Sequence, residues 1–270
     1  MSSSVLHVSD LHFGAGNGLD DEPAGVGIRD LVERVQPELV IASGDLTHGG
    51  RAAEHETAAR FLESLDRPLL VIPGNHDIPP FSPARFTRTW RDFNRQWGTT
   101  SPVSSTPSLQ AIGLNSVRPL GYQRGRLRGV DLERAERLLA EAQPGALRVV
   151  AIHHQLTGAP WRMRKLPLIA RSRVLARLAD AGAELIVGGH IHQATVCERR
   201  DFEVLGGGSR PCVIVTAPGL GRPRPGRRYE VRGALVHRFD EQSLTVETHI
   251  WDRERFVQSS ERTFQRVRDV

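Results

Sequence analysis

The sequence has little cysteine and no long apolar run. Its 270 residues contain two cysteines, Cys197 and Cys212, and neither has a neighbour at metal-binding spacing. This excludes a disulfide-stapled scaffold and a cysteine-type zinc site, and it suits a reducing compartment. No apolar run approaches the length of a membrane span. The N-terminus has no basic segment followed by an apolar stretch, so we expect no secretory signal and a cytoplasmic location.

Lysine is scarcer still, since Lys165 is the only lysine in the chain. Arginine supplies the rest of the positive charge, and the net charge is +5. A genome-wide codon preference explains this bias more simply than a functional demand does. Acidic residues are mixed with the arginines, as in residues 131–142. Because no long block of like charge is present, we expect no nucleic-acid partner and no membrane partner.

Composition and spacing indicate a single domain. An apolar fraction of 39% with 25% charged residues is typical of a globular protein with a sizeable core. The candidate ligands described below extend from residue 10 to residue 192, so a boundary near the middle would divide them. We therefore predict one domain over residues 1–270, with ligand motifs within 5–192 and further strands within 194–252.

Hydrophobic patterns predict strands alternating with helices. We expect strands at 5–9, 39–43, 69–72, 109–114, 148–152 and 184–187, and helices at 28–35, 52–65, 132–142 and 171–181. Such alternation is typical of parallel sheets with right-handed crossovers. We also expect a helix after Pro83 and a loop at 99–108.

Beyond His192 the pattern changes to shorter apolar runs split by glycine and proline. These lie at 194–198, 211–217, 228–239 and 243–251, and they predict antiparallel strands that close a second sheet. The predicted fold class is therefore α/β, a four-layer α/β/β/α sandwich in which two mixed sheets pack face to face with helices outside both.

Five of the short hydrophobic runs stop at potential metal ligands. These are Asp10 with His12, Asp45, Asn75 with His76 and Asp77, His153 with His154, and His190 with His192. In α/β proteins, ligand sites are assembled at the carboxyl ends of parallel strands. Five strand ends of this kind predict a two-metal hydrolytic centre.

The residue types narrow the choice of metal. Two divalent ions roughly 3.5 to 4 Å apart need a shared ligand, and a carboxylate with two oxygens is the natural bridge. Asp45, central in the set, is our candidate. Imidazole together with carboxylate suits Mn, Fe, Zn, Co or Ni, whereas an all-oxygen set would have indicated Mg or Ca. The pairs 10/12 and 190/192 each enclose one residue, so both side chains of a pair can face one cluster at a strand end.

In this order, DLH, GDLT, GNHD, the strand-end HH and GHIH resemble the calcineurin-like metallophosphoesterases over residues 5–192. The resemblance implies two divalent transition-metal ions. The implied ligands are Asp10, His12, Asp45 and His192 for one ion, and Asp45, Asn75, His153 and His190 for the other. A hydroxide bridging the ions would attack phosphorus in line with the leaving oxygen.

The resemblance also implies roles beside the ligands. His76 matches a family histidine that is not a ligand, and it would stabilise the transition state or protonate the leaving group, with Asp77 orienting its ring. His153 is chosen as a ligand because the family pattern places the ligand first. Gln155 stands where the family usually has proline, so His154 remains the alternative.

Length and the contexts SDLHFG, SGDLT and PGNHD resemble bacterial phosphodiesterases of the cyclic-nucleotide and glycerophosphodiester type. We therefore expect a phosphodiesterase acting on a small-molecule phosphoester, with a cyclic nucleotide or another phosphodiester as the candidate substrates. The alternatives are a phosphomonoesterase or nuclease of the same superfamily, and a non-catalytic scaffold. A protein phosphatase would show GDxVDRG where this chain has GDLTHGG, and a scaffold would lack ligands that are all present here. A monomer and a homodimer are equally open.

The other polar candidates receive structural interpretations. His7 is expected in the core or supporting a ligand, and His48 either reaches the cleft or lies on the surface. Asn115 is expected to form a turn. His55, His237 and His249 lie in no motif, so we assign them no functional role. We interpret the arginines of 219–228, together with Arg162, Arg164 and Lys165, as solvated side chains. The loops at 79–97, 115–128 and 219–228 are expected to select the substrate.

Overall fold

The first of two six-stranded sheets begins with three parallel strands. These strands are β1 (Ser3–Val8), β2 (Leu39–Ala42) and β3 (Leu69–Val71). The structure is a computed structural model, and it describes residues 3–14, 19, 22–80, 82–121, 123–157, 165–201, 209–223 and 230–267. On the other side of β1 the sheet continues antiparallel through β10 (Gly233–Phe239), β11 (Ser243–Trp251) and β12 (Phe256–Gln265).

The second sheet has a parallel centre and antiparallel edges. Its four parallel strands are β5 (Leu109–Leu114), β6 (Leu147–Ile152), β7 (Leu185–Gly188) and β9 (Val213–Thr216). The edge strands β4 (Val103–Ser105) and β8 (Thr195–Glu198) pair antiparallel with β5 and β9. The central strands are buried apolar runs, as expected where both faces of a sheet are covered.

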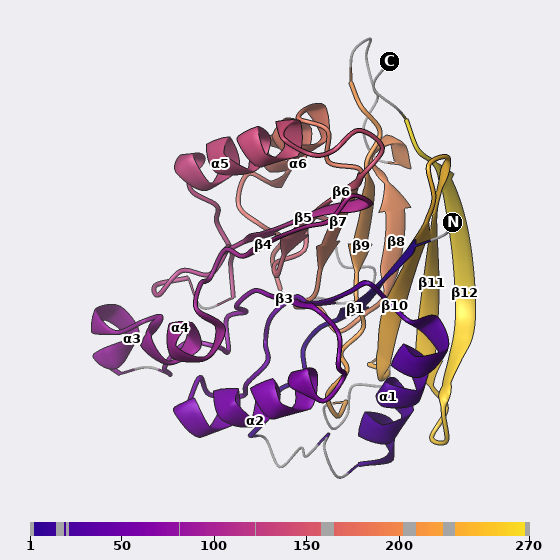
Figure 1. Cartoon of the computed structure of the whole chain (residues 1–270). Coiled ribbons are helices and arrows are strands. Elements are labelled where there is room, and N and C mark those ends of the chain that lie inside the picture. The colour runs from indigo at the N-terminus through magenta and orange to yellow at the C-terminus, as the bar shows by residue number, and fades with distance from the viewer. Residues whose placement is uncertain are drawn as a thin grey trace.

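Helices cover the outer face of each sheet (Figure 1). The first sheet is covered by α1 (Pro23–Val35) and α2 (Ala52–Glu63), and the second by α5 (Gly129–Ala140) and α6 (Arg171–Asp180). The short helices α3 (Ala84–Thr87) and α4 (Arg91–Trp97) follow β3 and project to one side, and a 3-10 turn spans Arg199–Asp201.

Alternation along the strands produces three apolar layers. In β1, Leu6 and Val8 join the core under α1 and α2, whereas Val5 faces the second sheet. In β6, Val149 lies in that middle core and Val150 packs under α5 and α6. Because successive strand residues point to opposite faces, each sheet contributes to two layers. The predicted four-layer sandwich is confirmed.

Several details of the prediction were wrong. The strands β10 to β12 extend the first sheet instead of the second, because β10 pairs with the open side of β1, and β9 is parallel to β7. The predicted loop at 99–108 contains β4, and β12 was not expected at all. Both are edge strands with largely exposed, polar residues, so their sequences lack the apolar alternation of a buried strand. The helix expected after Pro83 is divided into α3 and α4.

Candidate metal centre

The loops that follow β1 and β2 run side by side. The backbone N–H of Asp10 donates to the carbonyl of Gly44 over 2.9 Å, and that of His12 donates to the carbonyl of Asp45 over 3.0 Å. These bonds continue the parallel pairing of the two strands beyond their ends. They place Asp10, His12 and Asp45 next to one another.

Five predicted ligands have left-handed backbone conformations. Their φ values are 54° for Asp10, 52° for His12, 52° for Asp45, 74° for His190 and 58° for His192. Asp and His are among the few non-glycine types that tolerate this region. Each such residue costs on the order of 1 to 3 kcal/mol, and such strain concentrates at functional sites. The conformation accompanies the turns that bring Asp10 and His12 to one group of ligand atoms and divide His190 and His192 between two groups.

One group of converging ligand atoms comes from Asp10, His12 and His192. The Nε2 atom of His192 lies 3.1 Å from Oδ1 of Asp10 and 3.2 Å from Nε2 of His12. His12 Nε2 is also 3.9 Å from Oδ2 of Asp45. Two imidazole nitrogens and two carboxylates therefore face a common point.

A second group comes from Asp45, His153 and His190. The Nε2 atom of His153 lies 3.4 Å from Oδ1 of Asp45 and 3.3 Å from Oδ1 of Asn75. The other ring nitrogen, Nδ1, donates to the carbonyl of Ser43 over 2.8 Å. This bond orients the ring and joins the end of β6 in the second sheet to the end of β2 in the first.

Asp45 faces both groups, one with each carboxylate oxygen. Its Oδ1 lies near His153 and also accepts the backbone N–H of His76 at 2.8 Å, whereas its Oδ2 lies toward His12. The side chain is fully buried. The residues of the two groups are thus linked through this single carboxylate.

Buried polar atoms without hydrogen-bond partners test whether this cluster suits a metal. Oδ1 of Asp10, Oδ2 of Asp45 and both ring nitrogens of His190 make no hydrogen bond among the described residues, although all three side chains are buried. Buried polar atoms of this kind are costly unless they find a partner. Carboxylate, amide and imidazole atoms converging here fit divalent transition metals.

The electrostatics favour the protonation states that ligands need. Burial raises the pKa of Asp10 and of Asp45, but nearby histidines outweigh this effect. His192 holds the pKa of Asp10 well below the usual range, and His153 does the same for Asp45. Burial lowers the pKa of His12 to about 3. For His153 burial is opposed by Asp45, which raises its pKa to about 9. Ionised carboxylates and neutral imidazoles are the metal-binding forms, and a metal would displace the proton held by His153.

His76 lies at the open side of the cluster. It is half-buried, and its ring lies 4.9 Å from that of His12 and 5.7 Å from that of His48, measured between centroids. Its Nδ1 donates to the carbonyl of His48 over 2.9 Å. The His48 side chain is exposed, so it lies on the surface, but its ring nitrogen also converges with those of His12 and His76 beside the cluster.

The predicted role of Asp77 in orienting the His76 ring was wrong. Its carboxylate instead accepts backbone N–H groups, from Thr47 at 2.8 Å to Oδ1 and from Gly74 at 2.8 Å to Oδ2. It also accepts the hydroxyl of Thr47 at 2.9 Å. These bonds saturate the carboxylate, so Asp77 joins the loops after β2 and β3 and the His48 carbonyl holds the ring.

The structure separates the paired histidines after β6. His153 points into the ligand cluster, whereas Nδ1 of His154 lies 2.8 Å from the hydroxyl of Ser116. His154 packs closely on Gly125, where a Cβ would approach its ring to 2.4 Å. The geometry therefore favours His153 as the ligand.

Most of the other candidates lie where the structural interpretation places them. The side chain of Asn115 accepts the N–H of Val117 over 2.9 Å, a turn contact. His7 is buried with its Nε2 2.9 Å from the hydroxyl of Ser43, directly before the Gly44–Asp45 turn. Lys165 donates to the carbonyl of His190, so it contacts a ligand loop, contrary to our expectation. Arg162, Arg164 and residues 224–228 lie outside the described residues.

Sequence reasoning missed Glu230, which approaches the cluster from the segment before β10. Its Oε2 lies 3.9 Å from Nδ1 of His192, and both side chains are 6% exposed. No motif marks this residue, because it is far from the ligand strands in sequence and follows a Gly, Pro and Arg-rich loop. Only the tertiary structure brings it to His192.

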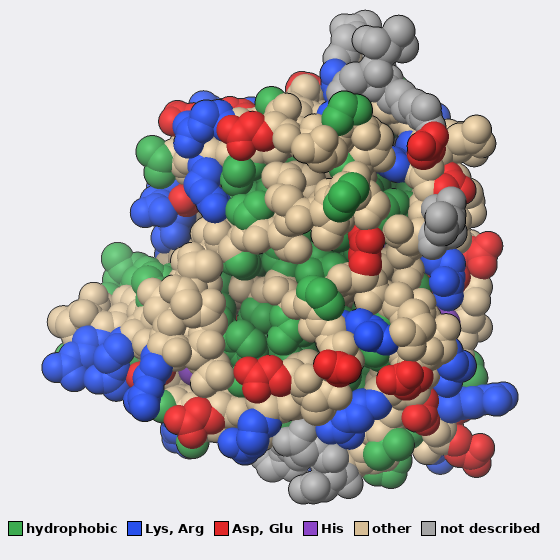
Figure 2. Space-filling view, in the orientation of Figure 1, with side chains coloured by type: hydrophobic (Ala, Val, Ile, Leu, Met, Phe, Trp, Pro, Cys, Tyr) green, Lys and Arg blue, Asp and Glu red, His purple; other side chains and the backbone are tan. Residues whose placement is uncertain are grey.

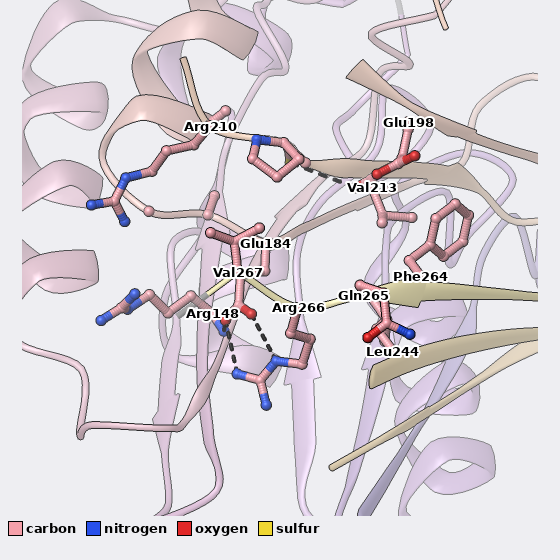
Figure 3. A pocket seen from close by; sticks show the side chains of 15 residues that line it. Arg148, Glu184, Glu198, Arg210, Val213, Leu244, Phe264, Gln265, Arg266 and Val267 are labelled. Atoms are coloured by element: carbon pink, nitrogen blue, oxygen red, sulfur yellow. Dashed lines mark hydrogen bonds and ion pairs between the residues drawn. The ribbon is translucent and has the colours of Figure 1, made fainter. Parts of the chain in front are cut away.

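A small pocket at the other end of the sandwich is separate from this centre (Figure 3). It lies where β7 begins, and it is lined by Glu184, Arg148, Arg210 and Arg266 among others. Arg266 forms a two-pronged ion pair with Glu184, while Arg148 and Arg210 point away from that pair. None of the predicted ligands lines it, so we interpret this pocket as part of the packing between the sheets.

The surface carries mixed charge. On the face shown in Figure 2, Lys and Arg side chains are interspersed with Asp and Glu around a more hydrophobic middle. This agrees with the mixed charges of the sequence. Among the helices that the structure describes, none combines the length and the apolar character needed to cross a bilayer.

Comparisons with known proteins give a family and several relatives. Residues 3–194 match the sequence model of the calcineurin-like phosphoesterases. A protein named "Probable cyclic nucleotide phosphodiesterase" from Synechococcus sp. is 29% identical over 204 residues, which cover 73% of this chain and 76% of that protein. A glycerophosphodiester phosphodiesterase from Enterobacter lignolyticus is 41% identical over 82 residues, covering 27% of this chain and 29% of the relative.

A solved structure shares the fold. The dimetal phosphatase from Danio rerio aligns with a TM-score of 0.62 at 12% sequence identity, covering 95% of this chain and 98% of that chain. At this identity the likeness concerns the fold alone.

Proposed function

This chain belongs to the calcineurin-like phosphoesterase family and is a metal-dependent phosphoric ester hydrolase, and from that premise we propose that it is a phosphodiesterase with a two-metal centre. Asp45 carries the proposal, because its two oxygens face two separate groups of ligand atoms. We assign Asp10, His12, Asp45 and His192 to one divalent transition-metal ion. We assign Asp45, Asn75, His153 and His190 to the other.

The ions would supply Lewis-acid stabilisation of phosphate charge and a water acidic enough to serve as the nucleophile for in-line attack on phosphorus. The chain's own contribution is to hold the ligands in advance. His153 is fixed by the Ser43 carbonyl, and the carboxylate of Asp10 is fixed by the backbone N–H of His190 at 2.9 Å. Such preorganisation reduces the rearrangement that binding and reaction require.

His76 is the proposed proton donor or charge-stabilising group for the leaving oxygen. Its Nδ1 donates to the His48 carbonyl over 2.9 Å, which fixes the orientation of the ring beside His12. The ring is half-buried beside His12, so it borders the ligand cluster without joining the two ligand groups around Asp45. A positioned imidazole of this kind contributes about 10² to 10⁴ in rate.

Relatives support a diester substrate over a monoester. The Synechococcus relative is named for cyclic nucleotides, and the relatives from Enterobacter lignolyticus and Escherichia coli are named for glycerophosphodiesters and for 3',5'-cyclic adenosine monophosphate. We therefore propose a small phosphodiester, with cyclic nucleotides as the first class to assay. Phosphomonoesters and nucleic acids are the alternatives to this assignment.

The proposal is tested by loading the protein with Mn, Co or Zn and comparing rates on cyclic nucleotides, glycerophosphodiesters, an aryl phosphodiester and an aryl phosphomonoester. We expect turnover of the diesters to exceed that of the monoester. Failure to hydrolyse any diester with each of these metals bound would refute it. A faster monoester reaction would favour a phosphomonoesterase.

Two substitutions separate the assigned roles. We expect His76→Ala to keep the metal content of the wild type while turnover of an aryl diester falls about 10² to 10⁴-fold. We expect Asp45→Asn to lose bound metal, because the amide removes the charge that both ligand groups share. Metal analysis and diester assays on the same preparations make the comparison. Equal metal loss in the two variants would contradict the assignment.

A further inference from the structure

Each ring of a metal-ligating histidine has a second nitrogen, and what that nitrogen contacts decides which tautomer binds the metal. In His153 the outer nitrogen Nδ1 donates to the Ser43 carbonyl, a neutral partner. In His192 the inner nitrogen is Nε2, since it lies 3.1 Å from Asp10 and 3.2 Å from His12. Its outer nitrogen, Nδ1, faces the carboxylate of Glu230 at 3.9 Å.

Building on the proposed two-metal centre, we propose that Glu230 is a positioning residue that orients His192 and strengthens it as a ligand of the ion held with Asp10 and His12. A carboxylate beside Nδ1 favours the tautomer with hydrogen on that atom, which leaves the Nε2 lone pair for the metal. It also makes the imidazole a more basic ligand. The outer nitrogen of His153 contacts the uncharged Ser43 carbonyl instead of a carboxylate, so the effect is specific to one ion.

The surroundings of His192 are built to admit this carboxylate. Gly219 lies against the ring, and a Cβ at that position would stand 3.0 Å from Nδ1. The carbonyl of Gly219 accepts the N–H of Gly233 over 3.2 Å, which joins this turn to the start of β10 just after Glu230. Glu230 and His192 are both almost fully buried, so water screens their interaction weakly.

Glu230 also lines a cavity that contains a second acidic residue suitable as a control. Glu22 lines the same cavity, but its carboxylate pairs with Arg222 at 2.6 Å and with Arg232 at 2.5 Å. Glu22→Gln therefore removes a negative charge from the same cavity without touching the contact with His192. Glu230→Gln removes the charge that faces Nδ1 while nearly preserving side-chain volume.

The test is a competition titration of Mn²⁺ or Zn²⁺ against a chromophoric chelator, with the metal content measured after dialysis. For wild type and Glu22→Gln we expect two ions per chain with the same pair of affinities. For Glu230→Gln we expect one affinity to weaken about 10 to 100-fold while the other stays unchanged, so that dialysis leaves close to one ion per chain. Thermal melting of the metal-free variants checks that the fold is retained.

If Glu230→Gln keeps both affinities of the wild type, the positioning role is refuted. If both affinities fall equally, or if Glu22→Gln behaves like Glu230→Gln, the effect is a general one of charge and the inference is overturned. Should Glu230→Gln fail to fold, the same titration on Glu230→Asp decides, because a shortened carboxylate must also weaken one affinity alone. A wild-type protein that binds no ion would instead refute the proposed function itself.

Discussion

At the scale of the residue, His237 shows how burial couples stability to pH. It is fully buried on the face of β10 that meets the second sheet, and its ring stacks on that of His7 with centroids 5.7 Å apart. Burial lowers the pKa of His237 to about 3, whereas an unfolded chain holds histidine near 6.5. Between these values the unfolded chain binds the additional proton. The contribution of neutral His237 to the free energy of unfolding is therefore fully present above pH 6.5, and it decreases as the pH falls below that value.

His237→Leu should remove this contribution. In metal-free protein, the plot of the free energy of unfolding against pH between about 6 and 4 should be less steep in the variant, by up to about 1.4 kcal/mol per pH unit. Urea denaturation at a series of pH values measures the slope. Identical slopes in variant and wild type would contradict this account of His237.

At the scale of the element, the turns at the strand ends do most to form the site. Gly44 precedes Asp45 with a φ of 98°, and a Cβ there would lie 2.6 Å from the N atom of Gly74 and 2.7 Å from Nδ1 of His153. The backbone of one ligand loop thus lies directly against the next. Any side chain at this position would separate the loops after β2 and β3.

Gly44→Ala should therefore lower both stability and metal affinity. A matched control is Gly145→Ala, because Gly145 also has a positive φ, 82°, but no described heavy atom lies within 4 Å of its ideal Cβ. The left-handed backbone alone costs roughly 1 to 2 kcal/mol in each variant. We expect Gly145→Ala to lose only this amount and to bind metal normally. Denaturation curves and metal titrations showing equal effects in the two variants would contradict the close-packing argument.

The strand ends were predictable from sequence because each combines an apolar run with an abrupt polar stop. The same pattern marked the candidate ligand positions, the resemblance selected seven of them, and the structure brings these seven residues together. The left-handed backbone conformation of five of these residues could not be predicted from sequence, because Asp and His adopt it only where tertiary contacts hold it. Asp77 was misassigned because adjacency in GNHD says nothing of where its carboxylate points.

Edge strands and contacts between residues far apart in the sequence could not be predicted from the sequence either. β12 presents mostly exposed residues, so its sequence resembles a loop until β11 is there to pair with it. Glu230 reaches His192 only because β10 returns to the first sheet. No local pattern encodes such a contact.

At the scale of the whole molecule, the two sheets are held together at both ends. At the proposed metal centre, His153 contacts Ser43 across the sheets. At the opposite end, Arg266 after β12 pairs with Glu184 before β7, with Nε–Oε1 2.7 Å and Nη2–Oε2 3.0 Å, and the Arg266 side chain is only 6% exposed (Figure 3). A shared apolar core lies between them.

Breaking the distal pair should affect stability without affecting the metal centre. Arg266→Met leaves Glu184 partly buried without its cationic partner, so we expect the free energy of unfolding to fall by about 3 kcal/mol. Metal content and diester turnover should match the wild type, because the pocket shares none of the proposed ligands. Chemical denaturation and metal analysis test this. Loss of metal in a variant that is still folded would show that the two ends are coupled.

Whether two ions share Asp45 is tested most directly by anomalous X-ray scattering from Mn²⁺-loaded crystals. We predict two anomalous peaks per chain, one beside Asp10, His12 and His192 and the other beside Asn75, His153 and His190, with one oxygen of Asp45 or both within bonding distance of each. A single peak at full loading, or two peaks of which Asp45 contacts only one, would contradict the account.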